Sequence, residues 1–111
     1  MLTRKLTAMG LWPQAFMDLA NVTAAGTTIA DAAQTHTSDI VVNAGTGGIL
    51  LPKGGEPADE VCVINTTGAS INVYPSGKDT LNGAQTAVAL AATKYMKFKC
   101  VAEGAWLQLI P

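Results

Sequence analysis

A succession of short apolar runs, each closed by glycine, asparagine or proline, constrains this chain more than any other feature. From residue 23 onward the runs recur about every ten residues, and several alternate apolar and polar positions. Such alternation is typical of β-strands, and the residues between the runs are those that tight turns require. We therefore expect an all-β fold, a small β-sandwich or barrel of about seven to nine short antiparallel strands.

The C-terminal part shows the alternation most clearly. A strand is predicted over 94–101, followed by a turn at 102–104 and a last strand over 105–110. Successive side chains of a strand point to opposite faces of the sheet. The face predicted to join the core carries Met96, Phe98 and Cys100. The face predicted to meet solvent or a partner carries Tyr95, Lys97 and Lys99. For this small basic stripe, which Lys94 extends, a solvated face is favoured over contact with an acidic partner.

Two further runs, 60–65 and 70–74, are separated by the short polar segment 66–69. This arrangement predicts a β-hairpin. The run 60–65 is apolar on both faces, which predicts a strand that is buried on both sides.

Glycine marks the other turns. The run 38–43 is expected to end in a turn at 45–48, because NAGTGG lacks the spacing and the terminal Lys-Ser/Thr of a phosphate-binding loop. Asn82-Gly83 predicts a tight turn, and 86–90 predicts another short strand.

The first 21 residues are expected to form a separate N-terminal arm, and the β-domain is predicted over 22–111. Pro13 is suited to the first turn of a short helix, which would carry Phe16, Leu19 and Ala20 on one face. Two interpretations stay open: a helix packed on its own domain, and an arm that docks on a neighbouring subunit. In the second, we expect the interface with that subunit to include Leu11, Trp12, Phe16, Met17 and Leu19.

The N-terminal segment does not resemble a signal peptide. Arg4 and Lys5 precede an apolar run, but that run extends only from 8 to 12 before Pro13. No stretch approaches the ~20 apolar residues of a transmembrane helix. We expect a soluble protein that is made in the cytoplasm.

Composition narrows the choice of partner. Charged residues make up only 14% of the chain, although 49% of its residues are hydrophobic. A surface so poor in charge predicts that part of it is buried against another protein. The net charge of −1 gives no electrostatic reason to expect nucleic acid or an anionic membrane as partner.

The residues that carry chemistry are few and scattered. The single histidine, His36, lies in a polar stretch far from Cys62 and Cys100, and is expected at the surface. The two cysteines fit buried, reduced core residues better than a disulfide. Adjacent strand residues point to opposite faces, so Asp59 and Glu60 are not expected to converge. We therefore expect no enzyme activity, no catalytic residues, no metal site and no cofactor.

Three segments carry a resemblance to a known family. They are Val63–Pro75, with the pattern V-x-N-x-x-G-x-x-I-N-V-Y-P, then Asp79–Gly83, and Cys100–Trp106, which reads Cys-Val-Ala-x-Gly-x-Trp. Over roughly 23–110 the chain resembles a β-domain of virion proteins of tailed bacteriophages. The resemblance is to small capsid decoration (cement) and head-fibre proteins in particular.

This resemblance implies a homo-oligomer, commonly a trimer, that binds the major capsid protein at the virion surface and stabilises the shell. The N-terminal arm would dock on the capsid, with Trp12 and Phe16 as anchors, since aromatic residues dominate interface hot spots. The alternative is a receptor- or glycan-binding module of a head or tail fibre. Outside the arm, the aromatic residues available for a sugar site are Tyr74, Tyr95 and Trp106.

Overall fold

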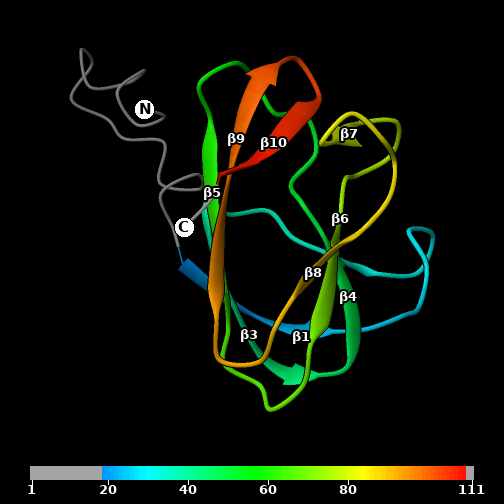
Figure 1. Ribbon diagram of the computed structural model, residues 1–111, viewed down its shortest axis with the longest axis vertical. Coiled ribbons are helices and arrows are strands. Elements are labelled where there is room, and N and C mark those ends of the chain that lie inside the picture. The colour runs from blue at the N-terminus through cyan, green and yellow to red at the C-terminus, as the bar shows by residue number, and fades with distance from the viewer. Residues whose placement is uncertain (1–18, 110–111) are drawn as a thin grey trace.

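The computed structural model describes residues 19–109, which fold into ten β-strands in two sheets (Figure 1). Sheet A has six strands in the order β1-β3-β5-β9-β10-β7, and sheet B has four in the order β2-β4-β6-β8. The strands are β1 (Leu19–Ala24), β2 (Ala33–Gln34), β3 (Asp39–Gly45), β4 (Gly47–Leu50), β5 (Glu60–Asn65), β6 (Ile71–Tyr74), β7 (Thr80–Leu81), β8 (Val88–Leu90), β9 (Tyr95–Ala102) and β10 (Ala105–Leu109).

The first six strands stack in the manner of a β-solenoid. The chain passes from sheet A to sheet B and back, so that β1, β3 and β5 are parallel neighbours in sheet A. In sheet B, β2, β4 and β6 are likewise parallel. The prediction of an all-β fold is confirmed. The predicted antiparallel sandwich or barrel is wrong here, because each coil pairs with the previous coil and not with the next strand along the chain.

The remaining strands close this stack with antiparallel pairs. β8 pairs with β6 in sheet B, and β9 pairs with both β5 and β10 in sheet A. The predicted C-terminal hairpin is confirmed as β9–β10. The predicted turn at Asn82-Gly83 is also confirmed: both residues have positive φ, 55° and 87°, and Leu81 and Ala84 exchange backbone hydrogen bonds across it.

The predicted hairpin of 60–65 with 70–74 is wrong. These segments are β5 and β6, which lie in different sheets, and 66–70 is the corner between them. The glycine-rich segment after β3 is a second such corner, leading to β4. At that corner Gly48 exchanges two backbone hydrogen bonds with Ala25 of the preceding coil, at 3.0 and 3.1 Å. A hairpin and a corner use the same turn residues, and the sequence around them does not distinguish the two.

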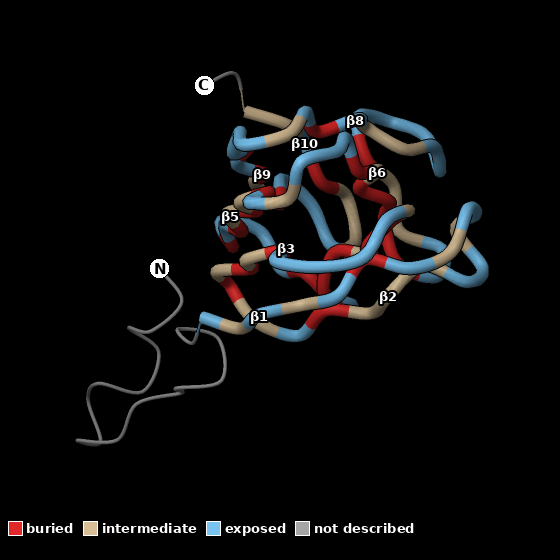
Figure 2. Tube along the Cα trace, turned by 90° about the horizontal axis from the view of Figure 1, so that it is seen from below, coloured by how far each residue is buried: buried red, intermediate tan, exposed pale blue. Residues whose placement is uncertain are grey.

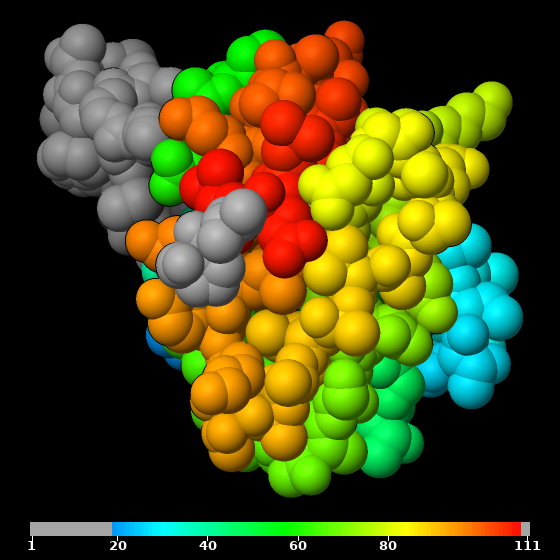
Figure 3. All heavy atoms as spheres, viewed as in Figure 1, coloured from blue at the N-terminus to red at the C-terminus, as the bar shows by residue number. Residues whose placement is uncertain are grey.

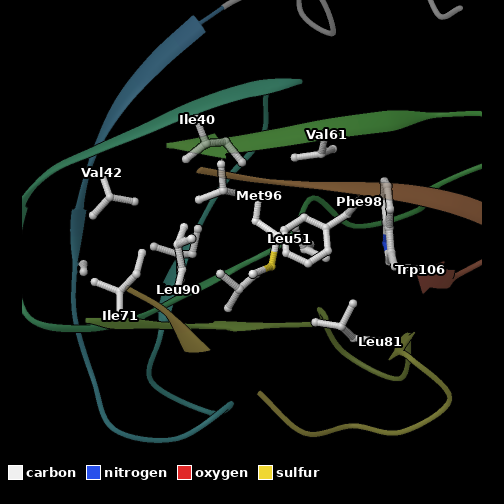
Figure 4. Close-up of a cluster of buried hydrophobic side chains, with 14 of the residues drawn as sticks. Ile40, Val42, Leu51, Val61, Ile71, Leu81, Leu90, Met96, Phe98 and Trp106 are labelled. Atoms are coloured by element: carbon white, nitrogen blue, oxygen red, sulfur yellow. The ribbon is translucent and has the colours of Figure 1, made fainter. Parts of the chain in front are cut away.

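The hydrophobic core fills the space between the sheets (Figures 2 and 4). The predicted core positions of β9 are confirmed, since Phe98 and Cys100 are fully buried and Met96 is 8% exposed. The largest fully buried side chains are Trp106, Phe98, Ile40, Ile49, Leu51, Ile71, Leu81 and Leu90.

Among the described residues, β1 already includes Leu19, ahead of the expected boundary at 22. The helical prediction is wrong for Leu19 and Ala20, which belong to β1 and pair with β3. The other expected interface residues lie outside the described residues: Leu11, Trp12, Phe16 and Met17.

Candidate interaction surface

The side of sheet A that faces away from the core is the candidate functional surface, called here the outer A face. Its middle row follows from the strand registers, which place one residue of each strand beside the next. Across the sheet the row reads Leu19, Asp39, Cys62, Lys97 and Leu109. It has apolar residues at both ends, an acid and a base inside them, and a thiol at the centre.

A second row of the outer A face is uncharged. The registers align Asn21, Val41, Ile64 and Tyr95 on β1, β3, β5 and β9. Val41 and Ile64 are only partly buried, and Tyr95 is 51% exposed. Aliphatic and aromatic side chains thus lie next to one another on a solvent-facing sheet, a feature that marks interaction sites on soluble proteins.

The third row holds one ion pair and one exposed leucine. Glu60, Lys99 and Leu107 lie side by side on β5, β9 and β10. Lys99 Nζ is 3.5 Å from Glu60 Oε2, and both side chains are more than 40% exposed. Such a pair contributes little stability, at most about 1 kcal/mol. Leu107 is 43% exposed, and Val101 further along β9 is 51% exposed.

Cys62 at the centre of the face is a weak nucleophile. Partial burial raises the pKa of its thiol, the Asp39 carboxylate raises it further, and Lys97 lowers it. Both cysteines are free, so no disulfide joins them. The expectation of a buried residue holds for Cys100 but not for Cys62, which is half-buried and points outward from sheet A.

A separate group of partly buried polar atoms lies near the pairing of β7 with β10, whose surfaces adjoin in Figure 3. Burial raises the pKa of Asp79, the Gly54 backbone lowers it through a hydrogen bond, and the charge of Glu103 raises it. Asp79 Oδ2 and Trp106 Nε1 are buried without a hydrogen-bond partner among the described residues. Gly55 lies directly over the Trp106 ring, where a side chain would collide with it. These groups join three segments of the fold, but they do not pair a nucleophile with a base.

The residues considered for catalysis do not come together. His36 is exposed, as predicted. Asp59 is 7% exposed and accepts a hydrogen bond from the Glu56 backbone N–H, while Glu60 points outward to Lys99. Between residues 19 and 109 no group of three His, Cys, Asp or Glu side chains is arranged to hold a metal ion.

The described part of the chain contains no helix with the length and apolar character needed to cross a bilayer.

Two of the three aromatic residues considered for a sugar site are buried. Trp106 is fully buried and Tyr74 is 9% exposed, with its hydroxyl donating a hydrogen bond to the Thr27 carbonyl. Only Tyr95 presents its ring to solvent. The apolar-polar alternation in the sequence of β9 therefore predicted only one part of the outer A face. Val41, Ile64 and Asp39 were missed as members, because the pairings of β3 with β5 and of β5 with β9 join segments that are distant in the chain.

No protein-family model matches this sequence, and the comparison with curated proteins finds no match.

Proposed function

We propose that the protein is a bacteriophage virion structural protein, a capsid decoration (cement) protein that binds the capsid surface as a homo-oligomer and stabilises the shell. The observation that carries the proposal is the outer A face, where exposed Leu19, Tyr95 and Leu107 lie on a chain of low charge. A module of this kind acts through the area that it covers. The resemblance of residues 23–110 to phage virion β-domains supplies the partner, the major capsid protein, and a trimer as the first expectation for the stoichiometry.

Such a protein stabilises the shell through its free energy of binding. A ligand that binds only the assembled shell stabilises it by RT ln(1 + [L]/Kd), which is about 2.7 kcal/mol per site at a hundredfold excess over Kd. Many copies on one shell multiply the effect. No catalytic group is required, and the action needs only apolar anchors and a rigid body.

In this proposal the rigid body is the ten-stranded domain, and the anchors are Trp12 and Phe16 of the N-terminal segment. Leu19, the remaining member of the expected interface, is 58% exposed at the start of β1. The anchors thus precede the edge of sheet A in the chain.

The test uses purified full-length protein and isolated capsids of the phage that encodes it. We expect saturable, stoichiometric cosedimentation with expanded shells and a rise in their melting temperature. Removal of residues 1–18, which leaves β1 complete, and the double change Trp12→Ala/Phe16→Ala should each abolish binding. Lys53→Ala, a change in an exposed loop, is the matched control. Absence of binding by the wild-type protein would contradict the proposal, and unchanged binding after the deletion would remove the anchors from it.

The alternative of a glycan-binding module keeps little support, because Tyr95 alone among its three expected aromatic residues is exposed. A glycan array distinguishes the two functions. Binding to a defined sugar that is lost in Tyr95→Ala would favour the alternative.

A further inference from the structure

We propose that two copies of this chain pair face to face through their outer A faces, about a two-fold axis that runs along β5. The pairing does not depend on the capsid role. It replaces the trimer expected from the resemblance with a dimer, and it leaves the contact with the capsid to the N-terminal anchors. It follows from the order of residues across the face. When the face is rotated about this axis, residues of complementary charge or apolar character come to lie opposite one another.

The charged residues of the middle row would pair between the two copies. A two-fold axis along β5 exchanges the two sides of the sheet, so when the faces meet, each β3 lies opposite the other copy's β9. Asp39 then opposes Lys97 of the partner subunit, and Lys97 opposes Asp39 of the partner subunit. Cys62 lies on the axis. One operation thus forms two ion pairs, as an isologous interface requires.

The two charges have no such partner within residues 19–109. Asp39 and Lys97 flank Cys62 on strands that are not adjacent, with backbones about 9.6 Å apart at the spacing of neighbouring strands. The one ion pair found among the described residues of this face joins Glu60 and Lys99. Both charges influence the pKa of Cys62, with opposite sign, so their fields meet at the position of the axis.

The uncharged row is complementary under the same operation. Ile64 lies on the axis and meets Ile64 of the partner subunit, while Val41 meets Tyr95 of the partner subunit. At the rim of the middle row, Leu19 meets Leu109 of the partner subunit. In these two rows apolar residues therefore oppose apolar residues and charges oppose opposite charges. In the third row Glu60 meets Glu60 of the partner subunit, and each of these carboxylates is compensated by Lys99 of its own chain at 3.5 Å. A face that bound an unrelated protein would have no need of this symmetry.

The size of the face predicts a weak dimer. Four strand spacings across and six residues along the strands give about 400 Å² of flat area on each copy. Two such faces total about 800 Å², below the roughly 1,200–2,000 Å² of stable specific interfaces and in the range of weak, transient ones. We therefore expect a dimer that dissociates on dilution through the micromolar range.

The decisive experiment reverses one charge at a time in the full chain. Asp39→Lys and Lys97→Glu each place two like-charged pairs in the homodimer, and each should raise the dimer dissociation constant at least about tenfold in sedimentation velocity. An equal mixture of the two variants should form a heterodimer, because Lys at 39 then meets Glu at 97 and the unchanged Lys97 meets the unchanged Asp39. Native mass spectrometry identifies this species by its mass.

The control separates position from overall charge. Lys53→Glu has the same net charge as Lys97→Glu but lies in the exposed loop after β4. It should dimerise like the wild type, and its mixture with Asp39→Lys should give less heterodimer than the mixture of the two reversals, because only one of the two ion pairs can form. Circular dichroism and the melting temperature establish that all variants are folded. A wild type that stays monomeric at high concentration, forms a trimer, or dimerises unchanged by both reversals would overturn the proposal.

Labelling of Cys62 with a maleimide identifies any other occupant of the face, since Cys100 is buried. We expect a labelling rate that falls as the concentration of wild-type protein rises. Slow labelling at every concentration that becomes faster on removal of residues 1–18 would mean that those residues cover the face, and it would contradict the dimer.

Discussion

At the scale of single residues, one buried amide holds the corner between the sheets. Asn65 ends β5, is fully buried, and donates hydrogen bonds to the carbonyls of Ala69, Leu90 and Ala91 at 2.8 to 3.2 Å. Its Oδ1 accepts from the backbone N–H and the hydroxyl of Thr67. The side chain therefore joins the chain leaving sheet A to the chain returning from sheet B, and this explains a polar residue where an apolar one is expected.

Replacement of this amide should be costly. Asn65→Ala leaves one buried and two partly buried carbonyls without this donor, and we expect the free energy of unfolding to fall by about 2–4 kcal/mol. Asn43→Ala, at an exposed position on β3, is the control and should change it by less than about 0.5 kcal/mol. Urea denaturation measures both. Equal effects of the two changes would show that the corner does not depend on the amide.

A glycine pair tests the packing over Trp106. A Cβ at Gly55 would lie 2.5 Å from Trp106 Cζ2, and the fully buried ring has no room to move away. We expect Gly55→Ala to destabilise the fold by about 1–3 kcal/mol. Gly68→Ala meets no atom within 4 Å and should be close to neutral. Thermal unfolding compares the two, and a neutral Gly55→Ala would contradict the tight contact.

Two aspartates should respond to pH in opposite directions. Burial raises the pKa of Asp79 above its ordinary value of 3.8, so the folded state holds a proton that the unfolded chain has released. The contribution of Asp79 to stability is therefore present below pH 3.8 and is lost as pH rises through the raised pKa. Relative to the wild type, the free energy of unfolding of Asp79→Asn should therefore rise as pH increases over that window. Chemical denaturation at a series of pH values measures this difference.

Asp31 provides the control of opposite sign. Hydrogen bonds from the backbone and the hydroxyl of Thr28, and from the backbone of Thr27, lower its pKa. Its contribution is present above the ordinary carboxyl value and is lost as pH falls through the lowered one. Relative to the wild type, the free energy of unfolding of Asp31→Asn should therefore fall as pH rises. If the stability differences of the two variants from the wild type changed with pH in the same direction, the directions given for the two pKa shifts would be contradicted.

At the scale of elements, the corner between β3 and β4 depends on glycine for two reasons. Gly47 has φ of 108°, and a Cβ there would collide with the carbonyl oxygen of Gly26 in the coil beneath. Gly77 also has positive φ, 54°, but meets no atom within 4 Å. The two positions share the backbone strain and differ in the stacking contact.

Substitution at both positions isolates the stacking contact. Gly77→Ala carries the strain of positive φ alone, about 1 kcal/mol. Gly47→Ala adds the collision between coils, and we expect it to cost at least about 2 kcal/mol more. Chemical denaturation gives both values. If the two variants unfold alike, the coils are not in contact at this corner.

The elements also show which parts of the fold were accessible from sequence. The β9–β10 hairpin was predicted because its alternation, its turn and its partner all lie within one continuous segment. The hairpin of 60–65 with 70–74 was wrong because the partners of β5 are β3 and β9, which are distant in the chain. Local turn residues carry no information about such pairing. The outer A face was accessible only as far as Tyr95, Lys97 and Lys99 for the same reason.

At the scale of the whole molecule, a parallel stack and an antiparallel closure share one core. β5 joins them: it pairs with β3 in the stack and with β9 in the closure, and its Val61 and Val63 are buried. The strands at the margins of the sheets are shorter or paired on one side only, namely β1 and β7 in sheet A and β2 and β8 in sheet B. Stability should therefore be highest at the junction and decline toward the margins.

Native-state hydrogen exchange tests this distribution, because amides exchange through openings whose free energies range from near zero up to that of global unfolding. We expect the slowest exchange in β5 and β9, where opening must break pairs on both sides and expose Val63 or Phe98 to water. β2 and β7, with two residues each, should exchange fastest among the strands. Slower exchange in β2 or β7 than in β5 would show that the most stable part of the fold is not β5 and its neighbours. A dimer through the outer A face adds a condition: it should slow exchange in β3, β5 and β9 as concentration rises, and leave sheet B unchanged.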